Sequence, residues 1–194
     1  MTLAPERWIM ELTRKQLSAL LDQRSISPEW PWATNDESVI DKNFKDIIAE
    51  VRRKVNVLDK SDFGHYGSGY ASFVDCWLYR EEEAFRYATS GHYYYGLVVL
   101  LSRLSNFYVI GEGQKSWNNA GGSSYLPDLG FVDKITRPEV MDIAKQVCAI
   151  LDDRGLKRLY ANELDKLLPN DVQVPTVLSD RPWKQFDAIF YWED

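Results

Sequence analysis

The pattern that most constrains this chain lies between residues 70 and 118, where apolar residues follow a period of two. In "YASFVDCWLYR", residues 70–80, one face carries Phe73, Asp75, Trp77 and Tyr79, and the opposite face carries Val74, Cys76 and Leu78. "HYYYGLVVLLS" and "NFYVIGEG" are apolar on both faces, which predicts central strands of a sheet that is covered on each side. The terminal "QFDAIFYWED" alternates as well and predicts a final strand within the sheet, with Phe190 and Trp192 in the core.

Helical spacing appears before and after these strands. Residues 5–23 repeat apolar side chains at Trp8, Ile9, Leu12, Leu17, Leu20 and Leu21, which predicts a helix, although Thr13 and Gln16 could form a capping box that starts it later. Pro28 and Pro31 predict a loop over residues 24–35. A second helix is expected after Thr34 or Asn35 as N-cap, with an apolar stripe from Val39 to Val55.

A third helix is expected from Pro138, which suits a first turn, to just before Gly155. A short strand "LKRLY" and a short helix "NELDKLL" follow it. Strands in the middle of the chain with helices at both ends indicate an α+β fold. We therefore predict a largely antiparallel sheet of about five or six strands, packed against N-terminal and C-terminal helices, in a single domain over residues 1–194.

Charge and composition exclude several classes of protein. The net charge is −6 and no run rich in Lys and Arg is present, which argues against nucleic-acid binding and permits a basic protein partner. The longest apolar run, "YYYGLVVLL", is half the length of a membrane span, and the N-terminus does not resemble a signal peptide. Cys76 and Cys148 lie far apart in apolar surroundings and do not suggest a disulfide. These features predict a cytoplasmic protein with no membrane partner.

Motifs for cofactor or metal chemistry are incomplete. "GEGQKSW" lacks the glycine that precedes the lysine in a phosphate-binding loop, and Ser116 stands where a dinucleotide fingerprint needs its third glycine. The two histidines, His65 and His92, and the two cysteines are too scattered to suggest a zinc site or a nucleophile with its base. We predict no cofactor, no metal and no catalytic residue.

Two carboxylates leave an enzymatic alternative open. Asp75 and Asp187 each interrupt an otherwise apolar strand pattern, and a half-buried carboxylate can have a raised pKa that suits acid–base chemistry. The structural alternative is that each is solvated or pairs with a neighbouring arginine such as Arg80 or Arg103.

Residues 111–124, "GEGQKSWNNAGGSS", combine glycines and polar side chains with one large aromatic residue. This composition predicts an exposed binding loop on a rigid sheet. The expected partner-binding residues are Glu112, Lys115, Trp117, Asn118, Asn119, Tyr125 and Asp128. The alternative is that Trp117 belongs to the core and that the loop is only a connection.

The segments "GLVVLLSRLSNFYVIGEGQKSW", "GGSS", "PTVL" and "FDAIFYWED" resemble a group of small uncharacterised bacterial proteins, over roughly residues 91–194. In size and acidity the chain is also similar in kind to immunity proteins of bacterial polymorphic-toxin systems. That resemblance implies a protein that binds and occludes a toxin domain encoded nearby. A small hydrolase-like enzyme with a carboxylate site in a sheet-lined pocket is the alternative, and a structural or phage-related component is a third possibility.

Overall fold

A computed structural model describes residues 10–194 and has an α+β fold, as predicted. Its main sheet contains β1 (Leu58–Asp62), β3 (Phe73–Tyr79), β4 (His92–Ser102), β5 (Phe107–Asn118) and β6 (Gly121–Ser124), which neighbour one another in that order. All these pairs are antiparallel, while the short β7 (Lys157–Arg158) runs parallel to β5. The predicted sheet of five or six largely antiparallel strands is therefore confirmed.

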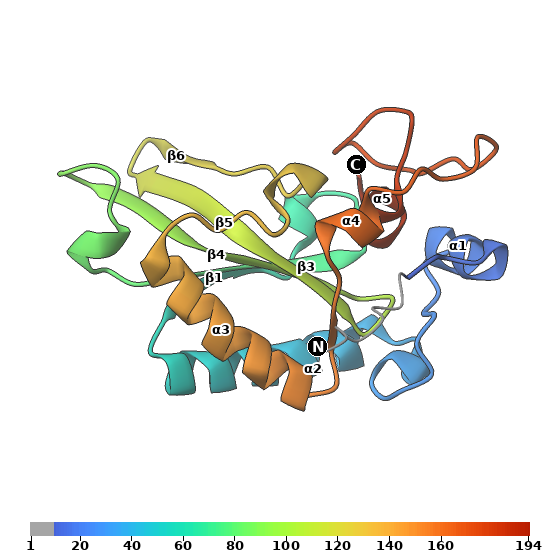
Figure 1. Cartoon of the computed structure of the whole chain (residues 1–194), viewed down its shortest axis with the longest axis horizontal. Coiled ribbons are helices and arrows are strands. Elements are labelled where there is room, and N and C mark those ends of the chain that lie inside the picture. The colour runs from blue at the N-terminus through green and yellow to red at the C-terminus, as the bar shows by residue number, and fades with distance from the viewer. Residues whose placement is uncertain (1–9) are drawn as a thin grey trace, which may run out of the picture.

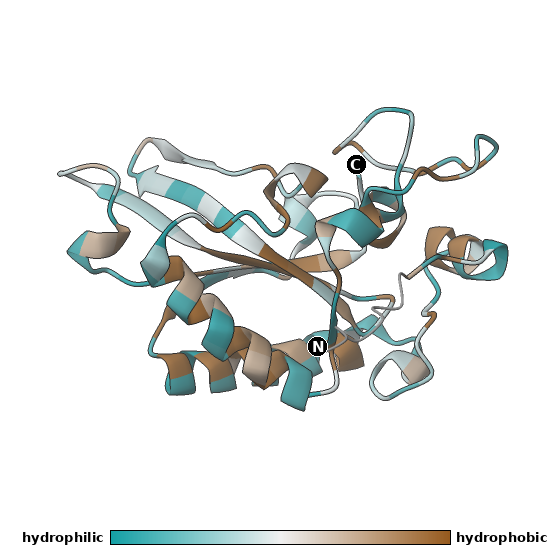
Figure 2. Cartoon of the chain, in the orientation of Figure 1, coloured by the Kyte–Doolittle hydropathy of each residue, from teal (hydrophilic) through white to brown (hydrophobic). Residues whose placement is uncertain are grey.

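Two amphipathic helices cover one face of this sheet, which we call the helix face. α2 (Glu37–Val55) and α3 (Pro138–Asp153) lie side by side below the strands in Figure 1. Their apolar stripes are buried, and the hydroxyl of Tyr108 on β5 donates to Asp152 of α3 at 2.9 Å. Figure 2 shows the corresponding hydrophobic colour along the middle of the sheet and the inner sides of both helices.

The C-terminal segment covers part of the opposite face, which we call the aromatic face. It contains α4 (Ala161–Leu164), α5 (Gln185–Ile189) and β8 (Trp192–Glu193), and β8 pairs with β2 (Tyr70–Ala71) in a separate two-stranded sheet. Phe190 packs edge-on against Phe73 of β3, with ring centroids 6.2 Å apart.

The predicted final strand is wrong for most of its length, because residues 185–189 form α5. The backbone N–H of Lys184 donates to the Asp187 carboxylate at 2.7 Å, which stabilises the first turn. Phe186 and Phe190 are both buried with ring centroids 5.3 Å apart, a spacing of four residues that fits a helical turn as well as an alternating strand. Periodicity does not separate helix from strand over so short a segment.

The N-terminal helices begin where side chains cap them. α1 (Arg14–Leu21) starts after Thr13, whose hydroxyl accepts from the Gln16 N–H while Gln16 accepts from the Thr13 N–H. The later start through a capping box is thus confirmed, and the helical spacing at Trp8 and Ile9 lies outside the described residues. α2 is capped by Asp36, not by Thr34 or Asn35 as predicted, because Asn35 adopts a left-handed backbone that ends the preceding 3-10 turn, Trp32–Thr34.

A buried arginine joins the helix face to the segment before β3. Arg103 is 1% exposed, and its Nε and Nη2 donate to the two carboxylate oxygens of Asp41 on α2 at 2.9 and 3.0 Å. Nη1 donates to the carbonyls of Ala71 and Phe73, and Nη2 also donates to the carbonyl of Phe63. All three guanidinium nitrogens of Arg103 thus donate to acceptors inside the protein, two of them to a carboxylate.

Within the described part of the chain, none of the helices is long and apolar enough to cross a lipid bilayer.

The two aromatic residues at the C-terminal end differ in burial, and this predicts different effects of truncating them. Phe190 is fully buried, so Phe190→Ala is expected to lower the free energy of unfolding by about 3–5 kcal/mol. Trp192 is only partly buried, with its indole N–H on the Ser68 carbonyl, and Trp192→Ala should cost about 1–2 kcal/mol. Urea denaturation of both variants measures the two values, and equal losses would contradict this assignment.

Candidate functional site

Residues 111–124 form a β-hairpin, so the prediction of a loop is wrong. β5 continues to Asn118, and β6 returns beside it after a turn at residues 119–120. Two glycines, one on β4 and one on β5, leave room for aromatic rings that lie against the sheet. A Cβ at Gly96 of β4 would lie 2.6 Å from Trp77 Nε1, and one at Gly113 would collide with the ring of Tyr125. Trp77 uses this space to donate to the Gly113 carbonyl at 3.1 Å.

Trp117 is the centre of an aromatic cluster near the hairpin end of the aromatic face. His92 stacks on it with ring centroids 4.8 Å apart and an interplanar angle of 7°, and Lys60 Nζ lies 4.2 Å from its centroid. Trp77 and Tyr79 approach it edge-on, and Tyr94 is tilted against it. Trp117 is therefore only partly exposed, and the expectation of a lone exposed tryptophan is wrong.

The residues predicted to bind a partner divide into two groups. Lys115, Trp117 and Tyr125 lie together on the aromatic face, with Lys115 Nζ 4.9 Å from the Tyr125 ring centroid. We call these three, with Lys60, His92 and the exposed Asn118 at the end of β5, the hairpin surface.

The other predicted residues have structural partners. Glu112 accepts from the Thr136 and Arg137 backbone N–H groups at 3.1 and 3.0 Å, which holds the start of α3. Asp128 accepts from the Gly130 N–H and so caps the 3-10 turn Leu129–Phe131. Asn119 differs from these two because it is simply exposed in the hairpin turn, where Asn118 Oδ1 accepts from the Ala120 N–H at 2.8 Å.

Asp75 lies beneath Tyr125 on the same face. It is 3% exposed, and its two oxygens accept from the hydroxyls of Tyr66, at 2.9 Å, and of Tyr125. Burial raises the pKa of the Asp75 carboxyl, although the charge of Lys115 and both tyrosine hydroxyls act in the opposite direction. Burial and the neighbouring Asp75 charge raise the pKa of both tyrosines, which keeps them protonated as donors.

The two carboxylates of the enzymatic alternative do not share a site. Asp187 accepts from the Ser179 hydroxyl at 2.6 Å and from the Lys184 N–H, so it stabilises α5. The expected arginine pairs are also wrong, since Arg80 donates to the carbonyls of Val55 and Asn56 and Arg103 pairs with Asp41.

A hollow of about 300 Å³ beside Tyr125 is lined by Glu112, Gly113, Gln114, Ser123, Ser124 and Tyr125.

The histidines and cysteines are also engaged in structure. His65 Nδ1 accepts from the Ala71 N–H at 2.9 Å, which leaves Nε2 to donate to Glu37 at 3.0 Å. Cys76 is buried, and burial raises the pKa of its thiol, which makes it a poor nucleophile. Across residues 10–194, no group of three or more His, Cys, Asp and Glu side chains is placed to hold a metal ion.

Sequence reasoning missed Lys60 and the structural role of His92. Lys60 lies on β1, opposite Trp77 of β3 in the register. β1 reads "LDKSD", a polar edge strand without the alternation that marks a half-buried strand, so its sequence carries no signal.

The cluster around Trp117 predicts a measurable loss of stability on truncation. We expect Trp117→Ala to lower the free energy of unfolding by about 1–3 kcal/mol, less than for a fully buried tryptophan because part of its surface is already in water. The exposed neighbour Asn119 provides the control, and Asn119→Ala should stay within about 0.5 kcal/mol of the unmodified protein. Chemical denaturation gives both values, and a negligible effect of Trp117→Ala would show that the cluster does not stabilise the hairpin.

The buried carboxyl of Asp75 predicts a pH dependence of stability. Because its pKa is raised in the folded state, the folded protein binds the proton more tightly than the unfolded chain does. This contribution is present at low pH and is lost as the pH rises from the ordinary carboxyl pKa of about 3.9 through the raised value.

Asp75→Asn removes the titration while keeping the shape of the side chain. The stability of the variant relative to the unmodified protein should therefore increase with pH across that window. Urea denaturation of both proteins at a series of pH values measures the difference in their free energies of unfolding. If the stability of the variant relative to the unmodified protein instead decreases with rising pH, the fold stabilises the ionised carboxylate of Asp75.

Comparison with protein-family models, with curated proteins and with solved structures found no match to this chain. The function must therefore be inferred from the geometry of its own side chains.

Proposed function

We propose that this chain is a cytoplasmic bacterial immunity protein that binds and occludes a cognate toxin domain encoded nearby. The observation that carries the proposal is the hairpin surface, where a partly exposed tryptophan is held between His92 and Lys60 at the open end of a rigid sheet. Protein interfaces use aromatic residues in fixed orientations as anchors and surround them with polar groups.

Preorganisation supports a binding role for this surface. Trp117 is fixed by aromatic rings from β3 and β4, so it loses little side-chain freedom when a partner covers it. Lys60 and Lys115 place two positive charges on the hairpin surface, in a protein whose net charge is −6. A complementary partner would present carboxylates to the two lysines and basic groups to the acidic remainder of the protein.

The alternative is a hydrolase-like enzyme, and the raised pKa of Asp75 is the observation in its favour. Two features weigh against it. Both oxygens of Asp75 are occupied by tyrosine hydroxyls, and the ring of Tyr125 lies between this carboxylate and the hollow at the hairpin. The carboxylate of Glu112, which lines that hollow, already accepts hydrogen bonds at the start of α3. A substrate would reach neither group without displacing these partners.

Charge reversal on the hairpin surface tests the proposal. The product of the neighbouring gene is co-expressed with the chain, and the affinity of the purified pair is measured by calorimetry. Lys60→Glu and Lys115→Glu should each weaken binding by about 2 kcal/mol or more and reduce protection of the host cell. Lys145→Glu on α3 is the matched control, since this lysine is exposed on the far side of the sheet, and it should leave affinity unchanged.

Thermal melting of each variant separates loss of binding from loss of folding. The proposal would be abandoned if the neighbouring gene product is not toxic and does not bind. If the neighbouring gene product binds and none of the three charge reversals changes its affinity, the immunity function still holds. The interface then lies outside the hairpin surface.

A further inference from the structure

A pocket unrelated to the hairpin surface lies in the long segment between α4 and α5. This segment forms the red loops that project at the upper right of Figure 1. Its two ends are joined by the Leu168 N–H, which donates to the Trp183 carbonyl at 2.8 Å. The pocket encloses about 320 Å³ and is lined by Leu168, Pro169, Asn170, Val172, Arg181, Pro182 and Trp183. Its volume is within the range of small-molecule sites, about 300–1,000 Å³.

The indole of Trp183 carries a hydrogen-bond donor without an acceptor. Its Nε1 is shielded from solvent and has no hydrogen-bond partner among the described residues. Buried donors of this kind are rare in folded proteins, because an unmade hydrogen bond costs the full desolvation of the group. Because Trp183 lines the pocket, a small turn of its indole ring toward a bound ligand would let a ligand oxygen satisfy the donor.

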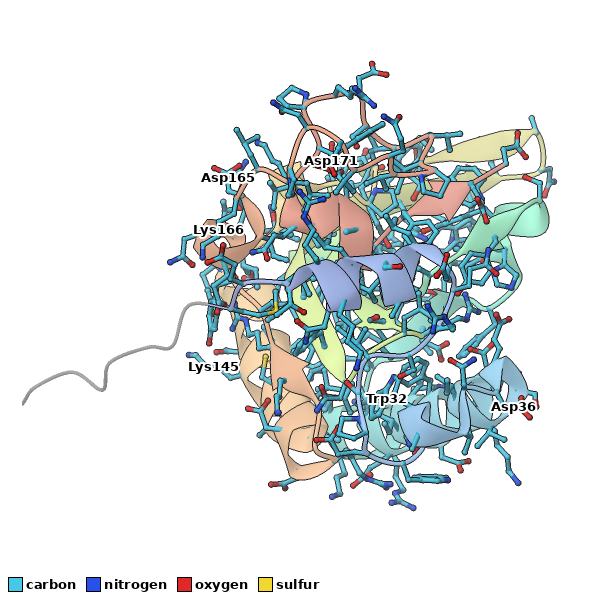
Figure 3. All side chains as sticks on the ribbon, turned by 90° about the vertical axis from the view of Figure 1, so that its right-hand side faces the viewer. Trp32, Asp36, Lys145, Asp165, Lys166 and Asp171 are labelled. Atoms are coloured by element: carbon cyan, nitrogen blue, oxygen red, sulfur yellow. The ribbon has the colours of Figure 1, made fainter. Side chains whose placement is uncertain are left out.

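Arg181 adds a positive charge at the same place. Its guanidinium lies over the Trp183 ring, 4.7 Å from the centroid, and the structure gives it no ion pair within residues 10–194. The nearby Asp171 does not compete for it, because Asp171 pairs with Arg14 of α1 at 2.5 Å. Figure 3 shows Asp171 in the loop directly above this helix.

The other residues that line the pocket indicate what the uncharged part of the ligand is. Leu168, Pro169, Val172 and Pro182 are apolar, and no acidic side chain is present among the lining residues that the structure describes. The polar side chains, Asn170, Arg181 and Trp183, all supply N–H donors. A single guanidinium matches a single negative charge, which favours a carboxylate over a doubly charged phosphate.

We propose that this pocket binds a carboxylate group carried on a compact hydrocarbon body. The carboxylate accepts from the Trp183 indole N–H and from the Arg181 guanidinium, while the hydrocarbon body contacts Leu168, Val172 and the two prolines. The site shares no residue with the hairpin surface and does not depend on the proposed immunity function.

The indole N–H resonance of Trp183 provides a direct test. The full chain is labelled with ¹⁵N, and the signal is assigned by its disappearance in Trp183→Phe. Phenylacetate and 4-methylpentanoate are titrated, and their amides serve as uncharged controls of the same shape. Both acids should shift the Trp183 indole signal in a saturable manner, because its N–H gains an acceptor, whereas the amides should bind at least about tenfold more weakly.

Two variants and one control assign the contacts. Arg181→Gln should weaken binding of the acids about tenfold, and Trp183→Phe should weaken it by a smaller factor, because a neutral donor contributes less than a charged one. Arg53→Gln removes an exposed charge from α2 and should change nothing. A short peptide that ends in a free leucine carboxylate distinguishes the source of the group: tighter binding than 4-methylpentanoate identifies a chain terminus, and weaker binding identifies a free acid.

The comparison of acid with amide requires no substitution, so it holds even if a variant fails to fold. Equal shifts with acids and amides, or no shift of the Trp183 signal at millimolar acid, would overturn the proposal.

Discussion

The paired guanidinium of Arg103 is the interaction on which the arrangement of the elements depends. A buried charge is costly unless its partners are all in place, and removing one of them commonly costs about 3–5 kcal/mol. The partners of Arg103 come from separate parts of the chain: Asp41 on α2, the carbonyl of Phe63 after β1, and the carbonyls of Ala71 and Phe73 around β3. Helix α2, β1 and β3 must therefore assemble together around the end of β4, which fixes one end of the aromatic face.

The elements that sequence predicted correctly are those with a long, regular pattern. β4, β5, α2 and α3 each bury a continuous stripe, and local periodicity is enough to define them. The errors fall where tertiary contacts decide. All five residues of 185–189 are buried, and over so short a segment their pattern fits a helix as well as a strand, so the hydrogen bond to the side chain of Asp187 selects the helix. The glycines of residues 111–124 suggested a loop, yet Gly113 is required by the ring of Tyr125 against the strand.

The candidate sites were less predictable than the fold because each is assembled from distant residues. Asp75 was identified from the sequence as an unusual residue, but its partners Tyr66 and Tyr125 come from turns before and after the central strands. Tyr66 adopts a positive φ of 56°, a conformation that no local pattern indicates for tyrosine. The interaction of Trp117 with Lys60 likewise depends on β1, a strand whose sequence gives no sign of pairing beside β3.

The aromatic face has two halves, and their difference bears on the binding role that we propose for one of them. Near Arg103, the C-terminal segment covers the face with Phe190 and Tyr191, which leaves no room for a partner. At the hairpin end none of the helices within residues 10–194 lies over it, and rings from β3 and β4 fill the space instead. The same packing that seals Asp75 beneath Tyr125 also fixes Trp117 and Lys115 in place. Because the side chains of the hairpin surface are already ordered, they lose little conformational entropy when a partner binds. We therefore favour recognition of a partner over chemistry at the buried carboxylate of Asp75.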